Sequence, residues 1–227
     1  MAIPSTETEY FLNLAPGKQQ RILEAAIHEF AERGYESASM NTVVKSAGIS
    51  KGALFKYFRS KTGLFAFVYR MALDQVKAYL RTVRDNSREE NFFVRLEKIM
   101  RAGVEFIQCR PGLARIYYRI VYTGDAPEKQ KLLKDIRGES LKFIQSLVQQ
   151  AMDRNELRPD LDPTVCAFVL ECILDRFIQV HHLEFMDPTL KLCGASADTS
   201  DQWIRQIVHM IRIGLQPISS QTRKESS

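Results

Sequence analysis

Residues 33–61 read RGYESASMNTVVKSAGISKGALFKYFRSK, and this stretch decides the fold. Its first half has apolar residues at the three- and four-residue spacing of one helix face, namely Met40, Val43, Val44 and Ala47. Gly48 follows, and glycine is the residue on which a helix most easily ends in a left-handed conformation. Ser50 is then a natural cap for a second helix that starts at Lys51. The stretch therefore predicts two short helices joined by a tight turn.

The second of these helices has an apolar side and a free side. Leu54 and Phe58 are four residues apart, so they share the side that we expect to be buried. The free side is small, aromatic and basic, with Gly52, Phe55, Lys56 and Arg59. Two short helices, a glycine-containing turn and such a free side are typical of a helix-turn-helix, whose second helix lies in the major groove of DNA.

Positive charge concentrates around the same helix. The 227-residue chain has a formal net charge of +5, and residues 45–61 contain five basic residues and no acidic one. This distribution favours binding to phosphate groups. Taken alone, a solvated basic surface is an equally good interpretation of it.

The segments on either side extend this head. Residues 16–33 predict a helix that begins with proline and braces the other two. Residues 1–15 predict a flexible arm, and because it has no basic residue before Lys18, a docked or disordered arm is favoured over one that contacts DNA. Ser60 caps a predicted long helix that runs to about Arg84 and connects the head to the rest of the chain.

The second half of the chain predicts a helical bundle. Apolar periodic stretches cover about 91–108, 111–122, 127–154, 163–185 and 200–215, with prolines at or near the breaks and no convincing alternating strand. The fold class is therefore all-α. The predicted organisation is a flexible N-terminal arm over 1–15, a helix-turn-helix DNA-binding domain over 16–62, a helical ligand-binding and dimerisation domain over 63–218, and a disordered tail over 219–227.

The sequence lacks the residue patterns that several classes of function require. The four cysteines and four histidines lack the spacing of a zinc site, so no metal and no cofactor are expected. A nucleophile elbow and a phosphate loop are also missing, which argues against an enzyme. The first ten residues are polar and no apolar run approaches about 20 residues, so we expect no signal peptide, no membrane span and a cytoplasmic location.

At this point the sequence resembles the TetR family of bacterial transcriptional regulators over about 50 positions. The matching segments are RILEAAIHEFAERGYESAS (21–39), AGISKG (47–52) and ALFKYFRSKTGLF (53–65). The sequence departs from the family pattern at Ala53 and Phe55, which lack the hydroxyl groups common there. Gly63 stands where glutamate is common in the family. It lies in the first turn of the long helix that Ser60 caps, and we expect it to weaken that turn by about 0.5 to 1 kcal/mol relative to alanine.

Side-chain chemistry, supported by this resemblance, assigns residues to DNA. Base contacts are expected from Gly52, Ala53, Phe55 and Lys56, because small residues permit close approach, lysine donates to guanine and phenylalanine contacts the thymine methyl group. Phosphate contacts are expected from Ser50, Lys51, Tyr57, Lys61, Lys18 and Arg21. For Tyr57 the alternative is a packing residue with a solvated hydroxyl group.

The bundle resembles a TetR-type ligand and dimer domain only in its helical layout. Candidate ligand contacts are Tyr118, Tyr122, Phe143, Phe168, Glu171, Asp175 and Arg176, with ordinary core packing as the alternative for the aromatic residues. The family commonly pairs its last two helices into a four-helix interface. On that basis the stripe of Trp203, Ile207, Met210 and Ile211 is the candidate dimer surface.

The resulting hypothesis is a homodimeric, sequence-specific regulator that binds a palindromic DNA operator. The resemblance implies a repressor that a small apolar effector molecule releases from the operator. The alternative is a helical scaffold or small-molecule-binding protein that acts through protein partners without binding an operator. The sequence does not name the operator, the effector or the regulated genes.

Overall fold

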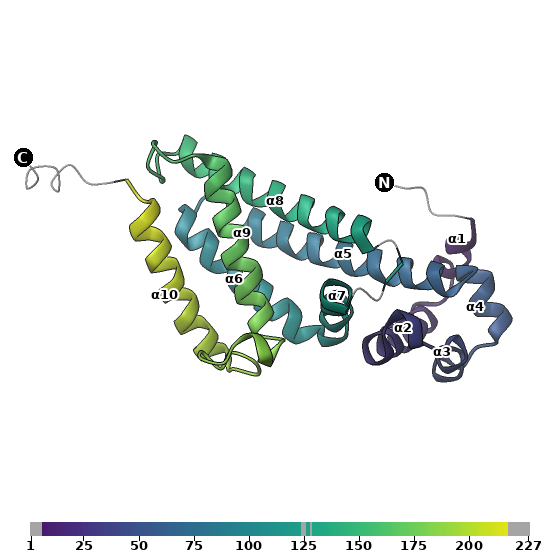
Figure 1. Cartoon of the computed structure of the whole chain (residues 1–227). Helices are drawn as coiled ribbons and strands as arrows, with labels where there is room; N and C mark the ends of the chain where they lie inside the picture. The colour runs from purple at the N-terminus through teal and green to yellow at the C-terminus, as the bar shows by residue number, and fades with distance from the viewer. Residues whose placement is uncertain (1–5, 124–125, 128, 218–227) are drawn as a thin grey trace, which may run out of the picture. The chain divides into compact units, whose positions relative to one another are not determined.

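The computed structural model describes residues 6–123, 126–127 and 129–217, and within these ranges every regular element is a helix (Figure 1). The elements are α1 (Thr6–Leu12), α2 (Pro16–Ser37), α3 (Met40–Ala47), α4 (Lys51–Phe58), α5 (Lys61–Asn86), α6 (Phe92–Cys109), α7 (Pro111–Thr123), α8 (Lys129–Asp153), α9 (Pro163–Val180), the short 3-10 helix η1 (Glu184–Met186) and α10 (Ala197–Leu215). The predicted all-α fold is confirmed. The tail predicted over 219–227 lies outside the described residues.

The chain divides into two compact units. The first comprises Met1–Lys77 and Arg110–Leu133, and the second comprises Ala78–Cys109 and Lys134–Ser227. Helices α5 and α8 each begin in the first unit and continue into the second. The first unit therefore contains α7 and the start of α5 in addition to the predicted helix-turn-helix.

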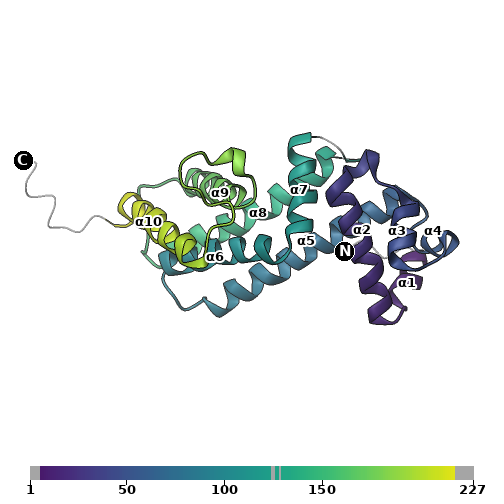
Figure 2. The same ribbon diagram turned by 90° about the horizontal axis from the view of Figure 1, so that it is seen from below.

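In the first unit α2 packs against α3 and α7, and α1 packs against α4 (Figures 1 and 2). Its core includes Ile22, Leu54 and Leu64, which are fully buried. Helix α2 does not end at Arg33 as expected but continues to Ser37 across a kink at Gly34, whose φ is 72°. Glycine accepts this positive φ without steric cost.

Helix α1 takes the place of part of the flexible arm predicted over residues 1–15. Residues 6–12 are helical, and the side chain of Phe11 is only 1% exposed. Its ring lies against Phe58 and Phe67, with centroid distances of 5.0 and 5.1 Å. Burial of this aromatic ring accounts for the docked arm, which is one of the two alternatives that the sequence favoured.

The turn between α4 and α5 reverses one expectation about glycine. The hydroxyl group of Ser60 accepts a hydrogen bond from the amide of Gly63 at 3.0 Å, so the predicted cap is present. A Cβ atom at position 63 would overlap the carbonyl oxygen of Phe58. Glycine is therefore required by the close approach of the two helices, instead of merely weakening the first turn.

In the second unit α6 packs against both α9 and α10 (Figure 1). The core of this unit is apolar and draws on Phe92, Leu96, Met100, Val148, Ala167, Leu170, Leu192, Ile204 and Val208. Within the ranges that the structure describes, no helix has both the length and the apolar composition to cross a membrane.

Candidate nucleic-acid interface

Local capping chemistry builds the helix-turn-helix as the sequence predicted. Ser39 accepts a hydrogen bond from the amide of Thr42 at 3.4 Å, and Ser50 accepts one from the amide of Ala53 at 3.1 Å. Gly48 ends α3 in the left-handed conformation, with φ 64° and ψ 42°. These three local features fix where α3 starts and ends and where α4 starts.

A buried carboxylate that the sequence did not point to holds α3 against α2. Glu29 lies on α2 and accepts a hydrogen bond from the amide of Ser39 at 2.7 Å. This charge-assisted bond satisfies a free amide at the start of α3. Glu29 lies seven residues after Ile22 and three after Ala26, on the buried face of α2, but helical periodicity does not predict its bond to Ser39.

Helix α4 buries Leu54, Tyr57 and Phe58, and the four predicted base-contacting residues lie on the rest of its surface. Gly52 and Lys56 are exposed, and Ala53 and Phe55 are half-buried. A Cβ atom on Gly52 would meet no atom within 4 Å, so the backbone is open to a partner at this point. A groove-binding helix needs such an open, small and basic surface.

Of the six predicted phosphate-contacting residues, four retain suitable positions. Lys51 and Arg21 are exposed, and Lys18 is half-buried near the start of α2. Ser50 is exposed and its hydroxyl group caps α4. Lys51 is the first residue of α4, so its positive charge adds to that of the helix start, which attracts anions.

Tyr57 and Lys61 have structural contacts that the sequence assignment to phosphate did not anticipate. Tyr57 is 7% exposed, and its ring meets Phe11 edge-on with the centroids 6.3 Å apart, in line with the packing alternative. Lys61 donates to the carbonyl oxygens of Glu36 and Ala38 at 2.8 and 3.0 Å. A lysine at this point neutralises the negative end of the α2 dipole.

Tyr10 of α1 is a neighbour of the predicted reading surface that the sequence did not identify. Its ring centroid lies 4.5 Å from Nζ of Lys56, which is the distance of a cation–π contact. A tyrosine in a segment without basic residues gives no signal of this contact, because the contact depends on how α1 docks on α4.

Helix α7 is fastened to α2 within the first unit. Arg119 donates through Nε to the carbonyl oxygen of Ala31 at 2.9 Å and through a terminal nitrogen to that of Glu32 at 3.0 Å. The carboxylate of Glu32 also forms an ion pair with Arg115. These contacts join residues more than 80 positions apart, so periodicity alone does not predict them.

The seven predicted ligand residues are shared between the two units. Tyr118 and Tyr122 belong to the first, where Tyr118 is buried and Tyr122 is exposed. The other five belong to the second. Phe143 packs partly buried against the core, whereas the side chain of Phe168 is 61% exposed.

The polar members of that set already have protein partners. Glu171 and Asp175 lie 3.8 and 3.7 Å from the guanidinium nitrogens of Arg137. Burial raises the pKa of the Glu171 carboxyl group, with Asp175 adding to the shift and Arg137 opposing it. Arg176 donates to the carbonyl oxygen of Met186 at 2.7 Å.

A surface pocket of about 410 Å³ lies elsewhere in the second unit, around η1 and the segment that follows it. Its lining residues are Glu184, Asp187, Pro188, Lys191 and Cys193. None of the predicted ligand residues is among them.

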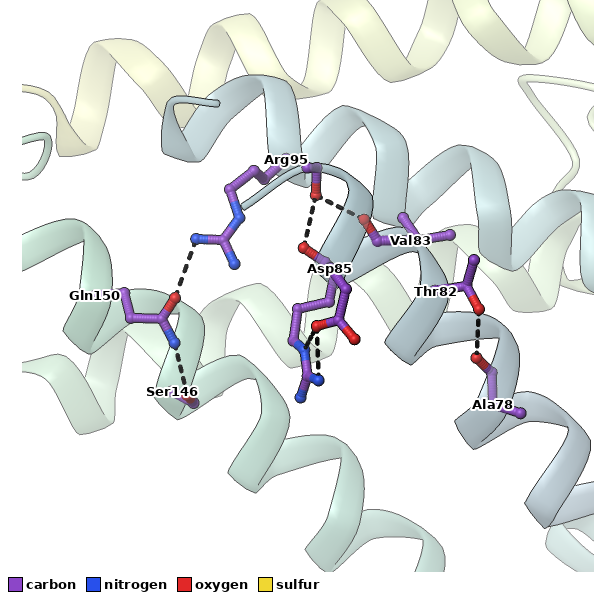
Figure 3. Close-up of polar contacts among 9 residues, drawn as sticks. Ala78, Thr82, Val83, Asp85, Arg95, Ser146 and Gln150 are labelled. Atoms are coloured by element: carbon purple, nitrogen blue, oxygen red, sulfur yellow. Dashed lines mark hydrogen bonds and ion pairs between the residues drawn. The ribbon is translucent and has the colours of Figure 1, made fainter. Parts of the chain in front are cut away.

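Arg95 is a buried cation in the second unit (Figure 3). One terminal nitrogen donates to the amide oxygen of Gln150 on α8 at 3.3 Å, and Nε has no hydrogen-bond partner among the described residues. Burial lowers the pKa of this guanidinium, as do the positive charges of Arg154, Arg84 and Arg88, while Glu156 opposes the shift.

The predicted dimer stripe turns out to face mainly inward. Trp203, Ile207 and Ile211 pack against the core of the second unit, and of the four predicted residues only Met210 is largely exposed, at 72%. The exposed apolar residues of the last two long helices are Val165, Phe168 and Val169 on α9 and Met210 and Ile213 on α10. Periodicity located an apolar face of α10 correctly, and three of its four predicted residues pack, partly buried, against the core of their own unit.

Comparison with known proteins gives matches over both parts of the chain. Residues 22–68 match the family described as bacterial regulatory proteins of the tetR family, and residues 90–216 match the tetracyclin repressor-like C-terminal domain.

Individual proteins show the same likeness. The chain is 24% identical over 153 residues to the uncharacterized HTH-type transcriptional regulator YhgD of Bacillus subtilis, covering 67% of this chain and 78% of that one. It is 26% identical over 145 residues to the HTH-type transcriptional repressor KstR2 of Mycobacterium tuberculosis, covering 64% and 72%. The crystal structure of a TetR family transcriptional regulator from Chloroflexus aurantiacus is similar at a TM-score of 0.71 and 26% identity, covering 93% and 99%.

Proposed function

Because the chain belongs to the TetR family of bacterial transcriptional regulators, and so is a DNA-binding regulator and not an enzyme, we propose that it acts in the cytoplasm as a homodimeric repressor. Two copies bind a palindromic operator, and a small apolar effector releases them. The observation that supports this most is the face of α4 beside its capped start, on which Gly52 and Lys56 are exposed and Phe55 is half-buried.

Operator reading rests on α4 in the major groove. Lys56 donates to guanine, Phe55 contacts a thymine methyl group, and Gly52 and Ala53 let the helix backbone approach the base edges. Lys51, Lys18 and Arg21 bind phosphates, with the α4 amides beside them. Without hydroxyl groups at positions 53 and 55, base reading depends on Lys56 and apolar contacts.

Dimerisation places two such heads on one operator. The apolar residues exposed on α9 and α10 support a paired surface, because burying them in a second copy removes apolar area from water. We therefore assign the interface to Val165, Phe168, Val169, Met210 and Ile213 in place of the inward-facing stripe. Paired heads require half-sites about one helical turn apart.

Release by the effector requires two states of the protein with different affinities for DNA. An apolar molecule that binds one shape of the bundle better shifts the population toward that shape. The chain passes between the two units three times, within α5, between α6 and α7, and within α8, and we assign the transmission to the first two. Helix α5 runs from one unit into the other, and α7, which directly follows α6, holds α2 through Arg119. A shift along either one changes the separation of the paired α4 helices.

The first experiment is selection of bound fragments from a random DNA pool by the full-length protein. We expect an inverted repeat with half-sites about one helical turn apart. Small molecules that release the protein from that sequence then identify the effector class. Recovery of DNA without a shared motif would contradict operator binding and favour the alternative, a scaffold that acts through protein partners.

A further inference from the structure

Helix α1 lies outside the segment that matches the family, which begins at residue 22, yet it is anchored on the recognition helix. Phe11 is buried, with its ring 5.0 Å from that of Phe58 and 6.3 Å from that of Tyr57, centroid to centroid. Both Tyr57 and Phe58 belong to α4. The inner flank of α4 therefore packs directly on α1.

The C-terminal end of α1 is also held. The side-chain amide of Gln19 on α2 donates to the carbonyl oxygens of Leu12 and Leu14 at 2.9 and 2.8 Å. These bonds satisfy carbonyl groups that the end of a helix leaves without partners. With Phe11 buried at one point and Gln19 bound at another, the orientation of α1 on the head is defined.

This orientation brings the ring of Tyr10 to Lys56. The ring centroid is 4.5 Å from Nζ, and both side chains reach the surface. An ammonium group has three N–H donors, and contact with one ring face leaves donors free for the acceptors of guanine. A lysine held on a ring loses less side-chain freedom when it binds a base than one that moves freely in solvent.

We propose that Tyr10 is a positioning residue for base reading, which holds the Lys56 ammonium group on its ring so that it meets the DNA already oriented. The proposal rests on the assignment of Lys56 to the major groove. It makes α1, a segment outside the matched family region, part of the reading head.

The test measures the affinity of Tyr10→Ala and Tyr10→Phe for the selected operator and for operators with single base-pair changes, at fixed salt. At the base pair read by Lys56, Tyr10→Ala should lower discrimination about two- to five-fold, the size of an exposed cation–π contact. Tyr10→Phe keeps the ring and should behave like wild type. Because neither change alters charge, the dependence of affinity on salt should stay the same.

Leu12→Ala is the matched control, since Leu12 lies on the same helix and is as exposed as Tyr10, at 48%. It should leave discrimination unchanged, and thermal unfolding of each variant checks that α1 stays docked. In a Lys56→Ala background, Tyr10→Ala should have no further effect.

Three outcomes would overturn the proposal: Tyr10→Ala without effect, an equal loss in the Lys56→Ala background, or a loss in Tyr10→Phe as large as in Tyr10→Ala. The last would mean that the hydroxyl group contacts DNA itself. If Lys56→Ala alone changed nothing, the groove assignment under the proposed function would fail instead, so the two failures are distinguishable.

Discussion

Neighbouring atoms, and not helical propensity, determine which residue type position 63 accepts. The residue lies in the first turn of α5, where glycine normally costs stability. Here the carbonyl oxygen of Phe58 occupies the space of a Cβ atom, so any side chain forces the α4–α5 turn apart.

We predict that Gly63→Ala lowers the free energy of unfolding by about 1 to 3 kcal/mol, the usual cost of overpacking. Urea unfolding at fixed pH measures the change. The control is Gly138→Ala in α8, where a Cβ atom would meet nothing within 4 Å, and this variant should gain about 0.5 to 1 kcal/mol. A comparable gain in Gly63→Ala would show that the turn relaxes freely.

At the same scale, residues differ in how far the sequence predicts their roles. The serine caps at positions 39, 50 and 60 were predictable because a cap depends on the next three residues only. The contact of Lys61 with Ala38 was not predictable, because it depends on tertiary packing, and for Tyr57 the packing alternative was stated without its partner Phe11. The contact between Tyr10 and Lys56 forms only when α1 is docked, so it was not predictable from the sequence either.

At the scale of helices, periodicity finds an apolar face but not what covers it. The predicted stretches of the bundle correspond to α6 to α10, with ends within a few residues except for α9. That helix stops at Val180, and η1 follows a short break. The stripe of Trp203, Ile207 and Ile211 is a real feature of α10, yet it packs on the core of its own unit.

His181 joins the end of α9 to the first turn of α10. Its Nδ1 lies 2.8 Å from the carbonyl oxygen of Phe177 and its Nε2 lies 3.0 Å from the hydroxyl group of Ser200, which suits a neutral ring that donates to one and accepts from the other. Burial lowers the pKa of His181 below its usual value of 6.5, while the bond to Phe177 and the charge of Asp187 oppose the shift.

This lowered pKa predicts how stability depends on pH. The unfolded chain binds a proton at His181 more readily than the folded one, so acidification favours unfolding. The stability that depends on a neutral His181 is fully present above about pH 6.5. It is lost as the pH falls from there toward the lowered pKa of His181 in the folded state. Unfolding free energies at pH 5 and pH 8 should differ more in wild type than in His181→Gln. Equal differences in the two proteins would contradict this account.

At the scale of the whole molecule, regulation requires two copies acting together. The exposed apolar residues on α9 and α10 are the surface that we assign to this pairing. A buried carboxylate without a partner is costly, so a single acidic substitution there should separate the subunits.

We predict that Met210→Asp shifts the protein from dimer to monomer in sedimentation at micromolar concentration. The side chain is 72% exposed in the single chain, so the substitution should leave the helical content unchanged by circular dichroism. Lys142→Asp, an exposed position on α8, is the control and should remain dimeric. If the wild-type protein were a monomer at this concentration, the proposal that two copies bind one operator would be contradicted.

The central claim is that α4 reads operator bases through Lys56, in two symmetric copies. The most direct measurement compares wild type with Lys56→Ala on the selected operator and on every single base-pair variant of it, at one salt concentration. We expect Lys56→Ala to lose about 1 to 3 kcal/mol of discrimination at one base pair of each half-site, at symmetric positions, with the other positions unchanged. An unchanged profile, or a uniform loss over all positions, would contradict it.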